Sequence, residues 1–291
     1  MGHLPTARTL LSSRRRREKI ADTASFLILL IMAAGAMLPI WWIFRSSLMS
    51  NAELYSYPPK FFPSKWLFSN YVETLQAYDF GRYLINTMTI IVPSVFGGTV
   101  TATLCGYAFA RLRFRGKKLL FTLCVGSMLL PGMVTLIPLY LMWTRIFHLN
   151  NSYLPLILPY FCGGGAFNIF LIRQFISSIP RELDEAATID GAGPMRVLVS
   201  ILLPAIRAAI IVVALFLFIQ MWNDLLQQTI YIDDPEKFTI AIGISMLKSG
   251  LKSDYAKIMA ATCMAFVPGV IIYLCGQKYF VEGIVMTGMK N

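Results

Sequence analysis

Charged residues are scarce in this sequence, and their scarcity argues against a soluble globular fold. Asp, Glu, Lys and Arg make up 14% of the 291 residues, and hydrophobic residues make up 56%. A soluble globular domain carries about 25% charged residues. The net charge of +11 is compatible with nucleic-acid binding, but the basic residues cluster beside apolar stretches, and membrane topology explains that pattern better. We therefore predict a membrane protein without a nucleic-acid partner.

The sequence also lacks the groups that would let it power transport or catalyse a reaction by itself. Its long apolar stretches contain no Asp, Glu, Lys, Arg or His except Arg207, whereas ion-driven carriers commonly keep a carboxylate at membrane depth. The G-x-x-x-x-G-K-[ST] loop that cradles ATP phosphates is absent. The five Cys and two His show no metal-ligand spacing. We predict no catalytic residue, no metal site and no cofactor bound by this chain.

Six apolar stretches are long enough to cross a bilayer, which takes about 20 residues in a helix. Several Pro residues fall within them, but neighbouring helices can satisfy the backbone groups that Pro leaves free, so Pro predicts kinks here. The first stretch is too long for a cleaved signal peptide and is followed by no small-residue cleavage site. We predict an all-α polytopic bundle whose six transmembrane helices lie near 24–44, 84–110, 119–141, 153–172, 201–222 and 258–277.

The basic residues predict the orientation of these spans. The densest basic runs are RRRR at 14–17 and RLRFRGKK at 111–118. Cytoplasmic loops carry an excess of Lys and Arg, and both runs are cytoplasmic if both termini are. We therefore predict cytoplasmic segments at 1–23, 111–118, 173–200 and 278–291, and external loops at 45–83, 142–152 and 223–257. Nucleic-acid binding is the alternative for the first run, but its place beside the first span favours topology.

The cytoplasmic segment between spans four and five has an unusual pattern. Residues 180–204 read PRELDEAATIDGAGPMRVLVSILLP. Pro180 suits the first turn of a short helix, Gly191 can end that helix in a left-handed conformation, and Pro194 can begin a second helix. Ala186 and Ala187 would let another protein approach the backbone closely, with the charge of Glu185 beside the contact. The alternative is an ordinary solvated amphipathic helix that joins two spans.

The same segment resembles the EAA---G---------I-LP signature of membrane subunits of binding-protein-dependent ABC importers. Seven positions match without a gap: Glu185, Ala186, Ala187, Gly191, Ile201, Leu203 and Pro204. With softer similarities at 69–90, 222–224 and 279–291, the chain resembles the smaller six-span subunit of maltose-type importers over nearly its whole length. The resemblance implies a coupling helix at 181–199 that docks on an ATPase.

The predicted division is a basic segment 1–23, a first span 24–44, an external loop 45–83, a five-helix core 84–280 and a cytoplasmic tail 281–291.

The resemblance also implies partners and a function. The partners are a second membrane subunit of a different sequence, two cytoplasmic ATPase subunits that bind ATP and Mg²⁺, and an extracytoplasmic solute-binding protein, assembled in a prokaryotic cell membrane. The expected function is the permease half of an ATP-driven importer for a sugar, in particular an oligosaccharide. The alternatives are a permease for a non-sugar solute such as a glycerol phosphate ester, and an ion-coupled secondary transporter. An intramembrane enzyme would need a base beside its nucleophile, and no span offers one.

Three sets of residues are candidates for contacts with the substrate and these partners. Aromatic rings stack on sugars and amides bind sugar hydroxyls, although helix packing is the competing role of each such residue. Glycines 163–165 predict a close helix approach or a bend, and the aromatic-rich loop 45–83 is expected to include an interfacial segment. The pathway candidates are Tyr140, Tyr160, Asn168, Gln220, Trp222 and Asn223. The candidates for contact with the binding protein are Asp233, Asp234, Lys248 and Gly250, in what is otherwise a plain connecting loop, and the ATPase-contacting tail is Lys290 and Asn291.

Overall fold

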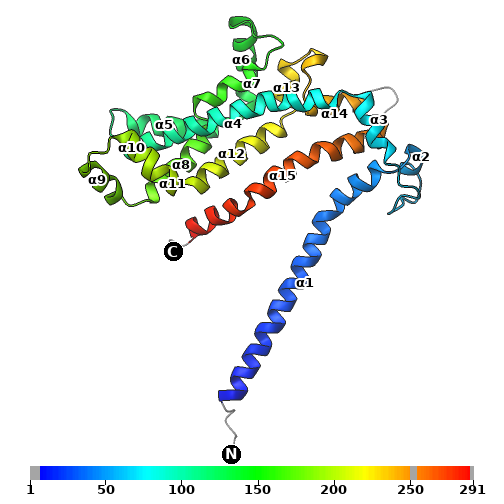
Figure 1. Ribbon diagram of the computed structural model, residues 1–291, viewed down its shortest axis with the longest axis horizontal. Coiled ribbons are helices and arrows are strands. Elements are labelled where there is room, and N and C mark those ends of the chain that lie inside the picture. The colour runs from blue at the N-terminus through cyan, green and yellow to red at the C-terminus, as the bar shows by residue number, and fades with distance from the viewer. Residues whose placement is uncertain (1–6, 250–253, 289–291) are drawn as a thin grey trace, which may run out of the picture. The chain divides into compact units, whose positions relative to one another are not determined.

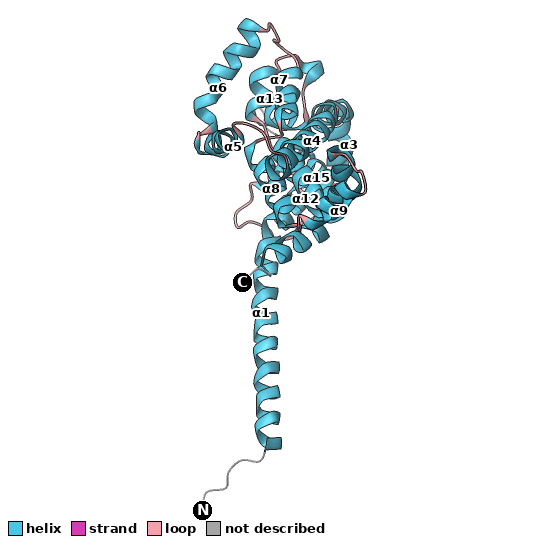
Figure 2. Cartoon of the chain, turned by 90° about the vertical axis from the view of Figure 1, so that its left-hand side faces the viewer, coloured by secondary structure: helices cyan, strands magenta, loops and turns pink. Residues whose placement is uncertain are grey.

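The computed structural model of the protein describes residues 7–249 and 254–288. All regular secondary structure in these residues is helical, which confirms the predicted all-α class (Figure 2). The α-helices are α1 (Ala7–Ser47), α2 (Asn51–Leu54), α3 (Ser69–Ala77), α4 (Phe80–Arg111), α5 (Lys117–Gly126), α6 (Gly132–Leu141), α7 (Leu154–Ile157), α8 (Ala166–Ser178), α9 (Glu182–Ile189), α10 (Pro194–Val197), α11 (Leu203–Ala205), α12 (Arg207–Trp222), α13 (Leu226–Tyr231), α14 (Ile240–Ser249) and α15 (Tyr255–Gly288). Short 3₁₀ turns cover Ser127–Leu129, Leu158–Cys162 and Pro235–Lys237, and π turns cover Met142–Ile146 and Leu198–Leu202.

The apolar stretches become four long helical spans and two bent pairs. Within the described residues, Ala21–Ser47, Phe80–Arg111, Leu154–Ser178 and Tyr255–Tyr279 are each long and apolar enough to cross a membrane. The bent pairs are Lys117–Leu129 with Gly132–Ile146 and Pro194–Ala205 with Arg207–Trp222, at angles of 102° and 80°. The number of spans is therefore four, or six if each bent pair is one span.

The first bend lies in the predicted span 119–141, where Pro residues predict a kink, and the second lies in 201–222, where its position is not predicted by the sequence pattern. At the first, Pro131 disfavours a helical conformation of the residue before it, and Leu130 accordingly has an extended ψ of 120°. Figure 2 shows α5 and α6 running in different directions from this point. At the second, Ile206 leaves the helical region with φ −101° and ψ 14°, so residues 201–205 belong with α10 and α11 rather than with α12.

The chain divides into two compact units, and the division differs from the predicted one. One unit contains residues 1–73 and 254–263, and the other contains 74–253 and 264–291. In the first unit, the start of α15 joins the external segment because Asn51 Nδ2 donates to Asp254 Oδ1 at 2.8 Å and Lys257 Nζ pairs with Glu73 Oε2 at 3.0 Å. These side-chain pairs lie about 200 residues apart in sequence, so hydropathy alone does not reveal them.

The core of the second unit is built where α4 packs against α8 and α12. Glycines allow the closest approach: a Cβ at Gly164 would lie 2.7 Å from the carbonyl oxygen of Gly98, and one at Gly106 would lie 2.6 Å from Ile172. Gly163, Gly164 and Gly165 all have positive φ, a conformation that other residues rarely adopt. This glycine run therefore provides both the bend and the close approach that the sequence predicts.

The two ends of α4 hold different parts of the second unit. At its C-terminal end, Arg111 and Tyr107 bind the segment that carries α9 and α10. At its N-terminal end, Asn86 Nδ2 donates to the carbonyl oxygens of Glu236 and Phe238, both at 2.9 Å. Figure 1 shows α9 and α10 at one end of α4, and α13 and α14 at the other. Because α4 has 32 residues, the two ends are about 48 Å apart, enough to lie on opposite sides of a bilayer.

Candidate coupling segment and transport pathway

The segment between α8 and α12 folds as a short helix, a tight turn and a second helix. Helix α9 ends in a Schellman motif: the N–H of Ala192 donates to Ala187 O at 2.8 Å, and that of Gly191 donates to Thr188 O at 3.0 Å. Gly191 has φ +82°, as its position after the helix predicts. The predicted segment 181–199 thus contains two helices, α9 and α10, separated at residues 190–193, as Gly191 and Pro194 predict.

The seven signature positions do not all face outward. Glu185 and Ala186 are exposed on α9, and Pro204 is exposed at the start of α11. Ala187 and Leu203 instead pack against the buried cluster formed by α4, α8, α10 and α12, and Ile201 is half-buried. The same docking role was predicted for both alanines, but only Ala186 lies on the open face. The inward positions fix the segment on the bundle.

The open face of α9 carries a large apolar side chain that the sequence interpretation missed. Ile189 is 86% exposed, and Leu183 is 50% exposed on the same short helix. Residues three or four apart share a helix face, so Ile189 lies in one row with Glu185 and Ala186. The spacing of four residues between Glu185 and Ile189 could have revealed that they share a helix face. Ile189 therefore adds apolar area to the exposed row that contains Glu185 and Ala186.

The opposite face of α9 is tied to the end of α4. Arg111 Nε forms an ion pair with Asp184 Oδ2 at 2.5 Å, without hydrogen-bond geometry, and Arg111 Nη2 donates to Ile179 O at 2.8 Å. The two charged side chains are 7% and 18% exposed. The hydroxyl of Tyr107 donates to Pro194 O at 2.9 Å. These polar contacts and the shared apolar core attach α9 and α10 to α4.

A cavity of about 300 Å³ lies between α12 and α15 and is mostly apolar. Trp222 stacks on Phe218 with ring centroids 5.4 Å apart. Gly269 keeps the opposite wall open, since a Cβ there would lie 3.7 Å from Trp222 Nε1. The lining residues are Phe218, Ile219, Trp222, Asn223, Phe266, Gly269, Val270 and Tyr273.

The six pathway candidates are dispersed. Trp222 and Asn223 line this cavity, whereas Gln220 is exposed outside it. Asn168 is buried and donates from Nδ2 to Gly164 O at 2.6 Å, which supports the glycine turn. Tyr140 packs beside Tyr231 with ring centroids 5.8 Å apart, and Tyr160 faces a second, much smaller cavity.

Asp224 is a carboxylate near the pathway that the sequence analysis did not select. It lines the small cavity with Tyr160 and Gln228, directly after Trp222 and Asn223. Burial raises the pKa of Asp224 above its ordinary value, and the hydrogen bond from the Gln227 N–H at 3.1 Å opposes that shift. Among the described residues no Lys or Arg forms a salt bridge with it. Its place in a W-N-D triplet was the available signal.

The loop after α13 is firmly attached to neighbouring segments. Asp234 accepts from the Glu236 N–H at 3.0 Å, and its own N–H donates to Asn151 Oδ1 at 3.3 Å. Lys237 Nζ donates to Asn151 O at 2.7 Å. Asp233 and Lys248 are exposed. The other candidates, Gly250, Lys290 and Asn291, lie outside the described residues.

Comparison with known proteins identifies the class of the chain. The family described as binding-protein-dependent transport system inner membrane component matches residues 98–284, which include residues 180–204 and the cavity between α12 and α15. The chain belongs to this family. This permease is therefore a multi-pass protein of the cell membrane and a transport component. The resemblance drawn from the signature is confirmed, although the signature alone does not assign a role to any single residue.

Several characterised relatives and a solved structure resemble this permease over nearly its whole length. The diacetylchitobiose uptake system permease protein NgcG of Streptomyces coelicolor is 29% identical, covering 94% of this chain and 89% of its own. The galactooligosaccharides transport system permease protein GanQ of Bacillus subtilis is 28% identical, with coverages of 97% and 100%. The sn-glycerol-3-phosphate transport system permease protein UgpE of Rhizobium meliloti is 30% identical, with coverages of 93% and 98%. A chain of a bacterial ABC transporter that imports alginate superposes with a TM-score of 0.77 at 25% identity, covering 91% of this chain and 98% of that one.

Proposed function

We propose that this permease forms half of the translocation pathway of an ATP-driven importer for an oligosaccharide. The observation that carries the substrate class is the cavity between α12 and α15, where Trp222, Phe218 and Tyr273 offer aromatic surface and Asn223 offers an amide. Aromatic surface binds the apolar faces of sugar rings, and a few polar groups then fix their orientation. Relatives named for chitobiose and galactooligosaccharide uptake support the same class.

The energy for transport would come from partner subunits. In this proposal, ATP and Mg²⁺ are bound by two cytoplasmic ATPase chains, and a second membrane subunit of different sequence completes the pathway. The exposed row of Glu185, Ala186 and Ile189 on α9 docks on an ATPase. Closure of the ATPases would move α9, and the ion pair of Asp184 with Arg111 would pass that movement to α4.

The same arrangement supports the predicted orientation in the membrane. The segment with α9 and the loop after α13 are attached to opposite ends of α4, which supports opposite sides of the bilayer. With α9 in the cytoplasm, the loop that contains Asp233 and Asp234 faces outward, towards a solute-binding protein. Both termini are then cytoplasmic, in agreement with the basic runs.

A phosphate ester is the second candidate substrate, because the relative UgpE is named for sn-glycerol-3-phosphate transport. A phosphate group requires cationic or strong donor partners. Among the described residues, the cavity between α12 and α15 is lined by no Lys or Arg. Asp224 directly follows Asn223, a lining residue of this cavity, and its carboxylate would repel an anion when ionised. The geometry therefore favours a neutral sugar.

Reconstitution of the whole importer in liposomes tests the substrate class. We expect ATP hydrolysis to be stimulated by binding protein loaded with an oligosaccharide and not by sn-glycerol-3-phosphate. Trp222→Ala should lower sugar transport about two- to tenfold, because an aromatic contact contributes about 0.5–1.5 kcal/mol, whereas Trp222→Phe should retain most of it. Stimulation by the phosphate ester alone, with Trp222→Ala fully active, would contradict the proposal.

The link between α9 and α4 gives a second test. Asp184→Asn leaves the guanidinium of Arg111 buried without its counter-charge, which costs about 3 kcal/mol or more. We expect the Tm of the purified assembly to fall by about 5 °C or more and transport to fall with it. The double variant Arg111→Met with Asp184→Leu removes both charges and should recover most of the lost Tm. If Asp184→Asn alone leaves Tm and transport unchanged, the ion pair does not hold α9 in place.

A further inference from the structure

Residues 56–66, which follow α2, fold back along the last turns of α1. The ring centroids of Phe61 and Phe62 lie 6.1 and 5.5 Å from that of Trp41. The chain then returns to the end of α1, where the N–H of Leu67 donates to Leu48 O at 2.9 Å. Because Trp41 precedes the end of α1 by six residues, the loop reaches back about 9 Å along the helix axis.

The depth of Trp41 in the bilayer fixes the depth of this loop. The first span, Ala21–Ser47, has 27 residues, and residues 21–40 are all exposed in this chain. Its midpoint is Ala34, so Trp41 lies seven residues further on, about 10 Å from the middle of the membrane if the helix is upright. The hydrocarbon core extends about 15 Å from its midplane. The rings of Phe61 and Phe62, which touch Trp41, therefore lie near the boundary between acyl chains and headgroups.

The composition of the loop suits that location. Phe61, Phe62 and Trp66 are 49%, 60% and 45% exposed, and Lys60 and Lys65 are exposed beside them. Aromatic residues gather at membrane–water interfaces, and Lys side chains extend from there towards the headgroups. We propose that residues 56–66 form an interfacial loop that inserts into the bilayer at the end of α1 and sets the depth of that helix.

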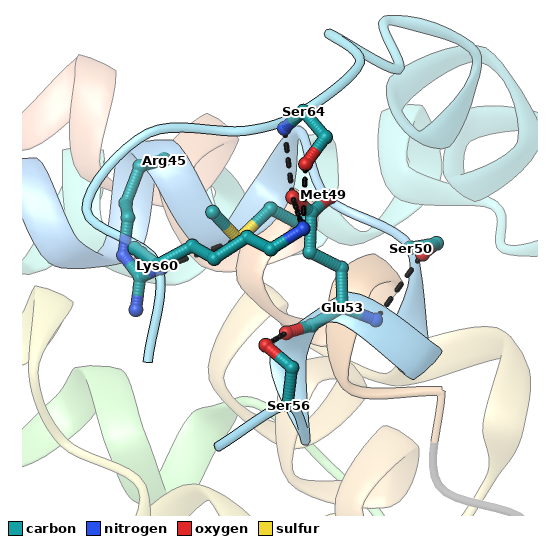
Figure 3. A network of polar contacts seen from close by, with 7 residues as sticks. All are labelled: Arg45, Met49, Ser50, Glu53, Ser56, Lys60 and Ser64. Atoms are coloured by element: carbon teal, nitrogen blue, oxygen red, sulfur yellow. Dashed lines mark hydrogen bonds and ion pairs between the residues drawn. The ribbon is translucent and has the colours of Figure 1, made fainter. Parts of the chain in front are cut away.

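A set of polar contacts holds the interfacial loop in position (Figure 3). Arg45 is 3% exposed, lies with Cζ 3.5 Å from the centroid of the Trp42 ring, and donates to Met49 Sδ at 3.3 Å and to Lys60 O. Glu53 Oε1 accepts from the Ser64 N–H at 2.7 Å. The contacts come from Arg45 in α1 and Glu53 in α2, and the rings of Phe61, Phe62 and Trp66 remain exposed and able to enter lipid.

The contacts of Arg45 and Glu53 use the backbone of Lys60 and Ser64, so they restrain the path of the loop. Lys60 Nζ also donates to Ser64 Oγ at 2.7 Å and lies 3.6 Å from Glu53 Oε1. The loop is therefore ordered before it meets the membrane, and an anchor of this kind restrains the tilt of a transmembrane helix.

Depth measurement by spin labelling tests the proposal. In a variant without the five native Cys that retains transport, Phe62→Cys is labelled with a nitroxide in the complete importer, in nanodiscs of phosphatidylcholine and phosphatidylglycerol. The control is Glu236→Cys, at a side chain 81% exposed in the loop after α13. We expect the ratio of oxygen to nickel-chelate accessibility to be at least fivefold higher at position 62 than at position 236.

The polar contacts provide a matched pair of variants. Arg45→Met removes the donor to Lys60 O and should raise nickel-chelate accessibility at position 62 at least threefold. Lys60→Ala keeps the carbonyl oxygen and loses only the contacts of the half-exposed Nζ with Ser64 and Glu53, so it should change that accessibility much less than Arg45→Met does. An accessibility ratio at position 62 equal to that at position 236 would overturn the proposal. Protection of position 62 that develops only with loaded binding protein would overturn it too, and would assign the loop to protein docking.

Discussion

Gly191→Val is expected to lower transport at least tenfold while the permease still inserts and assembles. Gly191 has φ +82°, and a left-handed conformation costs a residue with a Cβ about 1–2 kcal/mol. Apart from Gly191 and its two chain neighbours, no heavy atom of the described residues lies within 4 Å of a Cβ built there, so a new side chain would project towards any partner that docks on this turn. Insertion should survive because the turn lies outside the apolar spans. The measurement is transport, together with ATP hydrolysis stimulated by loaded binding protein.

Gly116 provides a closely matched control for that variant. It has φ +80° and no neighbour within 4 Å of a built Cβ, but it precedes α5 rather than following α9. Gly116→Val therefore introduces the same backbone strain outside the coupling segment and should have a much smaller effect. Glu185→Ala should reduce transport mildly, because a partly solvated charge pair contributes about 1 kcal/mol or less. If Gly116→Val and Gly191→Val lower transport equally, the loss would be explained by backbone strain alone, without partner docking at Gly191.

Ile189→Asp is expected to abolish most of the coupling between binding protein and ATP hydrolysis. Ile189 is 86% exposed in this chain, so its replacement should leave the fold of the permease unchanged. If an ATPase covers it, a carboxylate at this position loses its hydration without gaining a partner, which costs several kcal/mol. We expect at least a tenfold loss of stimulated ATP hydrolysis, measured on the reconstituted importer.

Ile189→Met is the matched control because it keeps an apolar side chain of similar volume, and such exchanges usually cost less than about 1.5 kcal/mol. It should retain most of the stimulated activity. Pull-down of the ATPase subunits with each variant separates loss of docking from loss of signalling. Normal coupling in Ile189→Asp would show that this face of α9 stays in solvent, and the proposed ATPase contact would then have to be abandoned.

The helical fold could be predicted from the sequence because its causes are local. Long runs without charge require helices in a membrane, since each helix satisfies its own backbone hydrogen bonds. The left-handed turn at Gly191 was predictable for the same reason, as glycine after a short helix adopts it at little cost. Pro residues predicted kinks, but the size of the bend before Gly132 and the position of the one at Ile206 were not predictable, because hydropathy sums residues along the chain and contains no information on the direction of the axis.

The facing of individual side chains was less predictable. Ala186 and Ala187 are adjacent residues of the same type, yet Ala186 is exposed and Ala187 packs on the buried cluster. Which of the two faces outward depends on how α9 rotates about its axis. That rotation is set by the pairing of Asp184 with Arg111, a residue 73 positions away in the chain. A single sequence does not specify such distant pairs.

The sequence by itself determined the membrane location, the helical class, the coupling signature and the turn at Gly191, because composition and short-range conformational preference act within a few residues. Tertiary structure alone decided which signature residues are buried, that Ile189 is exposed, that Trp222 and Asn223 share a cavity with α15, and that Phe62 lies beside Trp41. Each of these depends on contacts between segments far apart in the chain, whose geometry is fixed only when the helices pack.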